Sequence, residues 1–249
     1  MSTTARRRRI APPLLLGAVV LVVWEVACRS GLVDTFFLPA PSQVFVRLGE
    51  DLGAGLLAYT VPTLVEAGLG CLVGAAVALP LGYLAFRSPR AAAALDPYVA
   101  ASQAVPAVAL APLLMLWIGY GLVPIVVLCA LLVFFPILLT TILGLRSLDP
   151  DVLDAAKLDG AGGWDMLRHV EAPLALPAVL TGLRNGFTLS VTGAVVGEFV
   201  MGGRGLGMLV AARADSADTT GLFVALAVLC ALAMSVYGLL GTLEQRLHT

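Results

Sequence analysis

The sequence predicts an all-α integral membrane protein that folds as a single transmembrane domain over residues 1–249. Apolar residues make up 59% of the chain and charged residues only 12%, whereas a soluble domain carries roughly 25% charged residues. The mean hydropathy is +0.97, and several apolar runs reach the roughly 20 residues that a helix needs to cross a bilayer. These values argue against the soluble classes. A net charge of −1 also provides no basic excess for binding nucleic acid.

The apolar runs predict about six membrane spans. We expect them at about residues 10–28, 59–86, 101–118, 122–143, 174–200 and 221–243. The first span follows Arg6–Arg9, and a cleavable signal sequence begins in the same way. Glu25 occupies the position where a lipoprotein cleavage site needs an aliphatic residue, so we expect this segment to remain as an uncleaved first helix.

The polar segments between the spans predict connectors rather than further domains. The segment Leu38–Ser42 contains two prolines, which favour a turn or extended backbone before a short helical run at 43–57. The separator Gly119–Gly121 is too short for a domain. The longest polar interruption covers residues 146–173, so the functional residues are expected there or inside the spans.

The distribution of lysine and arginine predicts that both termini lie in the cytoplasm, because positively charged loops are retained on that side. With the amino terminus inside, ten basic residues fall on the cytoplasmic side and four on the opposite side. The ten are Arg6, Arg7, Arg8, Arg9, Arg87, Arg90, Arg146, Lys157, Arg168 and Arg246, and the four are Arg29, Arg47, Arg204 and Arg213.

The cytoplasmic loop 146–173 predicts two helical segments joined by a tight turn. Asp149 can cap a helix whose first residue is proline, and we therefore expect a helix over Pro150–Leu158. Gly160 then ends this helix, because glycine readily adopts the left-handed conformation that follows a helix. A second helical segment is expected at Trp164–Val170, beside the membrane rather than within it.

The residue order of this loop resembles the Glu-Ala-Ala loop in the permease subunits of bacterial ATP-binding cassette importers. The matching residues are Asp154, Ala155, Ala156, Gly160, Val170 and Pro173. Asp154 replaces the usual glutamate and Val170 replaces the usual isoleucine, and these replacements keep the charge or the shape. In that family the loop helix docks into a groove of the ATPase, so the resemblance assigns ATPase coupling to these six residues.

Further motifs extend the resemblance over most of the chain. They resemble the subfamily that imports nitrate, sulfonates, taurine and vitamin precursors. They are Leu38–Ser42, Asp96-Pro97, Val105-Pro106, Ala111–Leu113, Phe134–Ile137, Gly197–Phe199 and Gly205–Gly207. Sulfonate and taurine members carry a tryptophan before the glutamate of the fifth span. Here Thr192–Ala194 precede Glu198, which favours vitamin precursors such as the thiamine pyrimidine or riboflavin.

The resemblance also implies the partners and the location. It implies a type I importer fold in the bacterial inner membrane and a second permease copy, most simply an identical one. Two ATPase subunits and an extracytoplasmic solute-binding protein would complete the assembly. ATP and Mg²⁺ would bind to the ATPase subunits, and we expect this chain to bind no cofactor.

The chain itself is not expected to be an enzyme. A phosphate-binding loop needs glycines that lead into Gly-Lys-Ser or Gly-Lys-Thr, and Lys157, the only lysine, follows Ala156. His169 and His248 are isolated, and the four cysteines lie in apolar runs without metal-ligand spacing. We therefore expect no catalytic residue and no metal site.

The predicted spans contain ionisable residues and spaced glycines. Glu25, Glu66 and Glu198 fall near span ends, where each either reaches the membrane interface or faces a water path. Arg184 either faces a cytoplasmic vestibule or pairs with a carboxylate. The fifth span carries the small-residue spacings Gly182 to Gly186 and Gly193 to Gly197, which allow close helix packing.

Sequence spacing alone does not distinguish glycine packing within one subunit from glycines that border a translocation path. The resemblance favours the path and assigns Gly193, Gly197 and Glu198 to it. An alternative class is a self-sufficient secondary transporter or channel. That class predicts charges near the bilayer centre and repeated halves, and the sequence shows neither.

Overall fold

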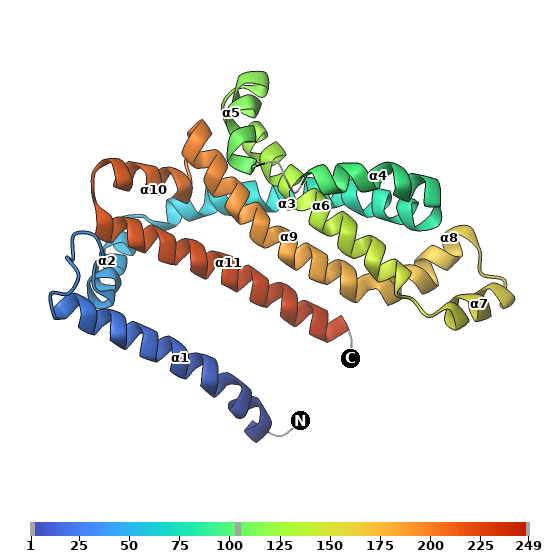
Figure 1. Ribbon diagram of the computed structural model, residues 1–249, viewed down its shortest axis with the longest axis horizontal. Coiled ribbons are helices and arrows are strands. Elements are labelled where there is room, and N and C mark those ends of the chain that lie inside the picture. Colours follow the sequence, from blue (N-terminus) through green and yellow to red (C-terminus); the bar gives the residue numbers. More distant parts are fainter. Residues whose placement is uncertain (1–2, 103–105, 248–249) are drawn as a thin grey trace. The chain divides into compact units, whose positions relative to one another are not determined.

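The computed structural model describes residues 3–102 and 106–247, and the described residues form helices joined by short connections (Figure 1). The α-helices are α1 (Thr3–Arg29), α2 (Pro41–Gly53), α3 (Leu57–Arg87), α4 (Pro89–Ser102), α5 (Ala107–Ile118), α6 (Leu122–Arg146), α7 (Pro150–Leu158), α8 (Gly163–Met166), α9 (Ala172–Met201), α10 (Leu206–Asp215) and α11 (Thr219–Leu247). A π-helix, η1 (Leu167–Glu171), joins α8 to α9. The predicted all-α class is confirmed.

Three described helices are long and apolar enough to cross a membrane: α3, α6 and residues 219–242 of α11. A fourth candidate is the bent pair formed by residues 163–201 and 206–215, whose two parts meet at 49°. The expected first span lies in α1, where several side chains fall outside the described part. The expected span at 101–118 includes residues 103–105, also outside it, and its described helix α5 has 12 residues. The count of six therefore stays a prediction.

The chain divides into two compact units, residues 1–57 with 209–228 and residues 58–208 with 229–249. In the first unit, Glu25 of α1 accepts hydrogen bonds from the Ser42 amide at 3.0 Å and the Ser42 hydroxyl at 2.8 Å. Ser42 lies in the first turn of α2, where the free amides favour a carboxylate. Glu25 therefore caps α2, and Arg29 pairs with the same carboxylate at 2.6 Å.

The second unit is built around α6 and α9, which lie side by side (Figure 1). Small residues along both helices allow the backbones to approach closely. A Cβ added to any of five glycines would meet the facing helix, in the pairs Gly144 with Ala178, Gly182 with Thr140, Gly186 with Val133, Gly193 with Leu132 and Gly197 with Ile125. The residue numbers of these pairs run in opposite directions, so α6 and α9 are antiparallel.

Helix α3 packs on this pair through a second stripe of small residues. A Cβ on Gly70 would overlap Cys129, and one on Gly74 would meet the carbonyl oxygen of Ala130. Nearby, the Ser190 hydroxyl of α9 donates to the carbonyl oxygen of Ala67 at 2.7 Å. These contacts fix α3 against both α6 and α9.

Replacing Gly70 by valine is expected to lower stability by about 1–3 kcal/mol or more, because extra methyl groups in a packed interface force the backbones apart. Gly68 provides a matched control on the same helix, since a Cβ there meets nothing within 4 Å among the described atoms. Thermal unfolding of the purified protein in detergent measures both variants. Equal midpoints for Gly70→Val and Gly68→Val would contradict the close α3–α6 packing.

Candidate functional site

The segment after α6 has the local geometry that the sequence predicts. Helix α7 covers Pro150–Leu158, and the Asp149 side chain accepts a hydrogen bond from the Asp151 amide at 2.9 Å. Gly160 follows with φ +90°, a conformation that side chains with a Cβ rarely adopt. The predicted helix, its cap and its glycine stop are all confirmed.

The residues assigned to ATPase coupling lie mainly at the surface of this segment. Asp154, Ala155 and Gly160 are exposed, and Asp154 pairs with Lys157 at 2.7 Å. Ala156 and Val170 are half-buried, and Pro173 is exposed in the first turn of α9. Large apolar side chains are exposed beside them: Leu158 is 89% exposed and Trp164 is 69% exposed. Both side chains lie on the same short segment between α6 and α9.

A buried carboxylate joins this segment to α3. Glu171, the last residue of η1, is 2% exposed and accepts a hydrogen bond from the Tyr83 hydroxyl at 3.0 Å. The Arg87 guanidinium lies 3.3 Å from the other oxygen of Glu171. The sequence analysis missed this cluster, because Glu171 is more than eighty residues away from both Tyr83 and Arg87 in the chain. Glu171 therefore connects the segment between α7 and α9 to α3.

A second buried carboxylate lies at the opposite end of α9. Glu198 is 1% exposed, and it accepts hydrogen bonds from the Thr63 hydroxyl at 2.7 Å and from the Gly207 amide. The Thr63 oxygen in turn accepts from the Leu206 amide at 2.8 Å. A Cβ on Gly205 or Gly207 would overlap this carboxylate. Glu198 therefore holds α3, α9 and the start of α10 together. It does not extend to a membrane interface, which was one of the two roles expected from the sequence.

The predicted path residues Gly193 and Gly197 face α6 of the same chain. These contacts are packing within one subunit, which was one of the two alternatives that the glycine spacing left open. The exposed side of α9 carries polar side chains instead, at Asn185, Thr188 and Thr192. These three residues recur at helical spacing, so they form one stripe along α9.

The sequence analysis also left open where Arg184 points. Its guanidinium carbon lies 4.3 Å from the centre of the Tyr237 ring of α11, a cation–π distance. Arg184 therefore helps to hold the second part of α11 against α9. Both residues belong to the second unit.

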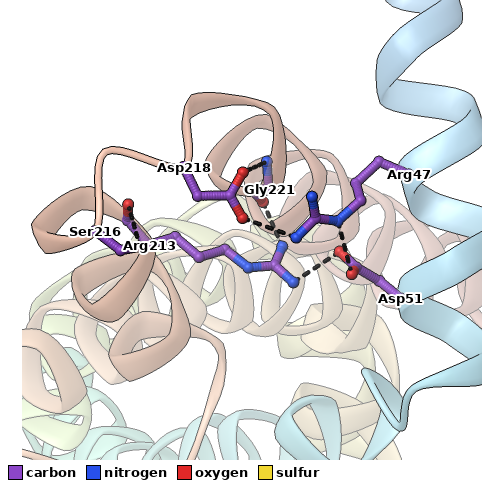
Figure 2. Close-up of polar contacts among 6 residues, drawn as sticks. All are labelled: Arg47, Asp51, Arg213, Ser216, Asp218 and Gly221. Atoms are coloured by element: carbon purple, nitrogen blue, oxygen red, sulfur yellow. Dashed lines mark hydrogen bonds and ion pairs between the residues drawn. The ribbon is translucent and has the colours of Figure 1, made fainter.

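The first unit contains a network of four alternating charges (Figure 2). Arg47 bonds Asp51 at 3.1 Å and Asp218 at 2.9 Å, and Arg213 bonds the other oxygen of Asp51 at 2.7 Å. Arg213 also donates to the carbonyl oxygen of Gly221. The hydrogen bond to Asp51, together with the nearby Asp218, raises the pKa of Arg47 above its ordinary value. The network fastens α2 to the turn between α10 and α11.

Replacing Asp51 by asparagine is expected to cost about 3–5 kcal/mol, because Asp51 is 8% exposed and removal of one partner leaves the charge of Arg213 unpaired. Glu50 is exposed on the same helix, so Glu50→Gln is the matched control, with an effect within about 0.5 kcal/mol. Thermal unfolding measures both. The network would be unimportant for stability if Asp51→Asn unfolded at the wild-type temperature.

The chain is similar to known membrane transport proteins. Residues 70–249 match the family model described as the binding-protein-dependent transport system inner membrane component. The chain is 43% identical over 231 residues to the riboflavin transport system permease protein RibX of Chloroflexus aurantiacus, covering 92% of this chain and 86% of that protein. It is 33% identical over 230 residues to the formylaminopyrimidine transport permease protein ThiX of Halalkalibacterium halodurans, covering 92% and 89%.

The fold likewise matches a solved structure. A chain in an inward-facing structure of the methionine ABC transporter MetNI superposes with a TM-score of 0.72 at 18% identity. The match covers 80% of this chain and 98% of that one. At this identity the likeness concerns the fold alone.

Proposed function

Because this chain belongs to the family of inner-membrane components of binding-protein-dependent transport systems, we propose that it is the permease subunit of an importer for a heterocyclic vitamin or vitamin precursor. Two of its relatives support this solute class, at 43% and 33% identity, since one is named for riboflavin and the other for formylaminopyrimidine. Sulfonates, taurine and nitrate are the competing solutes that the sequence left open. The chain would move the solute without covalent chemistry of its own.

The observation that carries this proposal is the exposed α7 segment, joined at both ends to long apolar helices. Ala155, Gly160 and the exposed Leu158 offer a small apolar surface that another protein can approach closely. We propose that α7 docks into the ATPase and that closure of two ATPases moves α6 and α9. Glu171 would carry the same movement to α3 through Tyr83 and Arg87.

The proposed assembly contains two copies of this chain, two ATPase subunits and an extracytoplasmic solute-binding protein. ATP and Mg²⁺ would bind only to the ATPase subunits. Helix α9 is the proposed wall of the path, through the predicted Gly193, Gly197 and Glu198 or through the exposed stripe of Thr188 and Thr192. Single cysteines along α9 that crosslink between copies would distinguish these two faces.

Reconstitution tests the transport function directly. The permease and ATPase are placed in liposomes, with the solute-binding protein outside and ATP inside. Labelled riboflavin, an aminopyrimidine and taurine are then supplied in turn. We expect ATP-dependent uptake of riboflavin or the aminopyrimidine and no uptake of taurine. Taurine uptake would reject the proposed solute class, and uptake without the ATPase would show a secondary transporter.

Both termini and the α7 segment are proposed to be cytoplasmic, because ten basic residues fall on that side. Ser216 and Asp151 are both exposed and are expected on opposite sides of the membrane. In a variant without native cysteines, Ser216→Cys should react with an impermeant thiol reagent added to intact cells, and Asp151→Cys should not. The reverse labelling pattern would overturn the topology.

A further inference from the structure

A cavity of about 490 Å³ lies in the second unit at the end of α9 that is remote from α7. Three separate segments of the chain form its wall: α3, the turn between α5 and α6 with the start of α6, and the break between α9 and α10. The lining residues are Pro62, Glu66, Tyr120, Gly121, Leu122, Ile125, Gly202, Gly203 and Arg204. Its volume falls within the roughly 300–1,000 Å³ of small-molecule sites, which combine apolar walls with a few polar groups.

Glu66 is the one acidic residue in this wall. It is 5% exposed, and its Oε2 atom is buried without a hydrogen-bond partner among the described residues. The carboxyl lies within hydrogen-bonding reach of Glu198, and two buried carboxyls this close share a proton instead of carrying two negative charges. A buried acceptor without a donor costs free energy, so a donor from a bound molecule would stabilise the Oε2 atom of Glu66.

The charges around the cavity restrict which kind of molecule can bind there and donate a hydrogen bond to Glu66. An anion would be repelled by the adjacent carboxyls Glu66 and Glu198. A cation would meet Arg204, which lines the same cavity, and no group of three potential metal ligands was found in the described part of the chain. The rest of the wall consists of the apolar side chains of Pro62, Leu122 and Ile125, three glycines and the exposed Tyr120. A neutral molecule with an N–H donor fits these features.

We propose that this cavity is a solute site of the permease, in which Glu66 accepts a hydrogen bond from a ring N–H of a neutral heterocycle. Tyr120 and Arg204 lie against the rest of the ring. In the proposed topology the cavity opens on the extracytoplasmic side, where the solute leaves its binding protein. The ligand class rests on the proposed function, whereas the role of Glu66 rests on the geometry of the cavity.

The test measures binding to the permease–ATPase complex in nanodiscs, without ATP and without the solute-binding protein. The probes are riboflavin, its 3-methyl derivative, which lacks the imide N–H, and an aminopyrimidine. We expect the wild-type complex to bind riboflavin about tenfold more tightly than the methylated probe, because the methylated probe leaves the buried acceptor unsatisfied.

Three variants assign this preference to Glu66. Glu66→Met removes the acceptor while keeping the volume, and it should bind riboflavin about tenfold more weakly and no better than the methylated probe. Glu66→Gln keeps one acceptor and should recover part of the preference. Glu50→Gln, on an exposed residue of α2, should match the wild type. Thermal unfolding of each complex shows that the variants are folded.

The inference is overturned if the wild-type complex binds neither riboflavin nor the aminopyrimidine, or if Glu66→Met keeps the wild-type affinity and preference. ATP-driven uptake by the wild-type complex with its binding protein is measured separately. Uptake that persists while Glu66→Met binds as the wild type does rejects the site and leaves the importer function standing. Loss of ATP-driven uptake in the wild type rejects the function itself.

Discussion

Replacing Gly160 by valine is expected to abolish solute uptake and to weaken association with the ATPase, while the permease still folds and inserts. Gly160 has φ +90°, where a β-branched residue is strained by roughly 1–2 kcal/mol. A Cβ at this position meets no described atom within 4 Å, so the chain itself has room for the side chain. The added bulk would instead stand on the exposed surface beside α7, where the partner is proposed to approach.

Two further substitutions, Gly162→Val and Gly160→Asn, show whether the loss comes from backbone strain at position 160 or from a larger side chain in this loop. Gly162 has an extended conformation with φ −150°, which any residue adopts, so Gly162→Val should retain most of the uptake. Gly160→Asn should lose less uptake than Gly160→Val, because asparagine tolerates positive φ better. Copurification with the ATPase and uptake at matched expression measure each variant. Wild-type uptake and association in Gly160→Val would remove the coupling assignment.

Replacing Glu198 by alanine is expected to lower stability by about 3–5 kcal/mol. The substitution leaves the Gly207 amide without its carboxylate acceptor, and each buried unsatisfied group costs about 1–3 kcal/mol. It also opens a cavity beside Gly205, where the structure is closely packed around the carboxylate. The junction of α3, α9 and α10 should therefore loosen, and the folded protein should be recovered in low yield.

Glu198→Gln provides the conservative comparison, since its side-chain carbonyl can still accept one of the two hydrogen bonds. Its loss of stability should fall well below that of Glu198→Ala. Thermal unfolding and hydrogen exchange of the Leu206 and Gly207 amides measure the effect, because both amides are bonded within this cluster. Slow exchange of these amides in Glu198→Ala would show that the carboxylate does not hold the junction.

The sequence by itself determined the features that depend on neighbouring residues. Long apolar runs require helices, because backbone groups in hydrocarbon must bond within their own segment. The bounds of α7 followed from Asp149, Pro150 and Gly160, which act on the backbone within a few residues. The sequence also identified Gly197–Phe199 and Gly205–Gly207 as motifs, but it did not predict that the two motifs contact each other.

Only the tertiary structure decided which of these features act together. The two motifs meet because Gly205 and Gly207 leave space for the Glu198 carboxylate. Thr63, which completes that cluster, lies 135 residues away in the chain, and Asp51 lies 162 residues from Arg213. Local propensity carries no information on such distant pairs. They form because a carboxylate removed from water must find donors, and the packing of small residues brings those donors within reach.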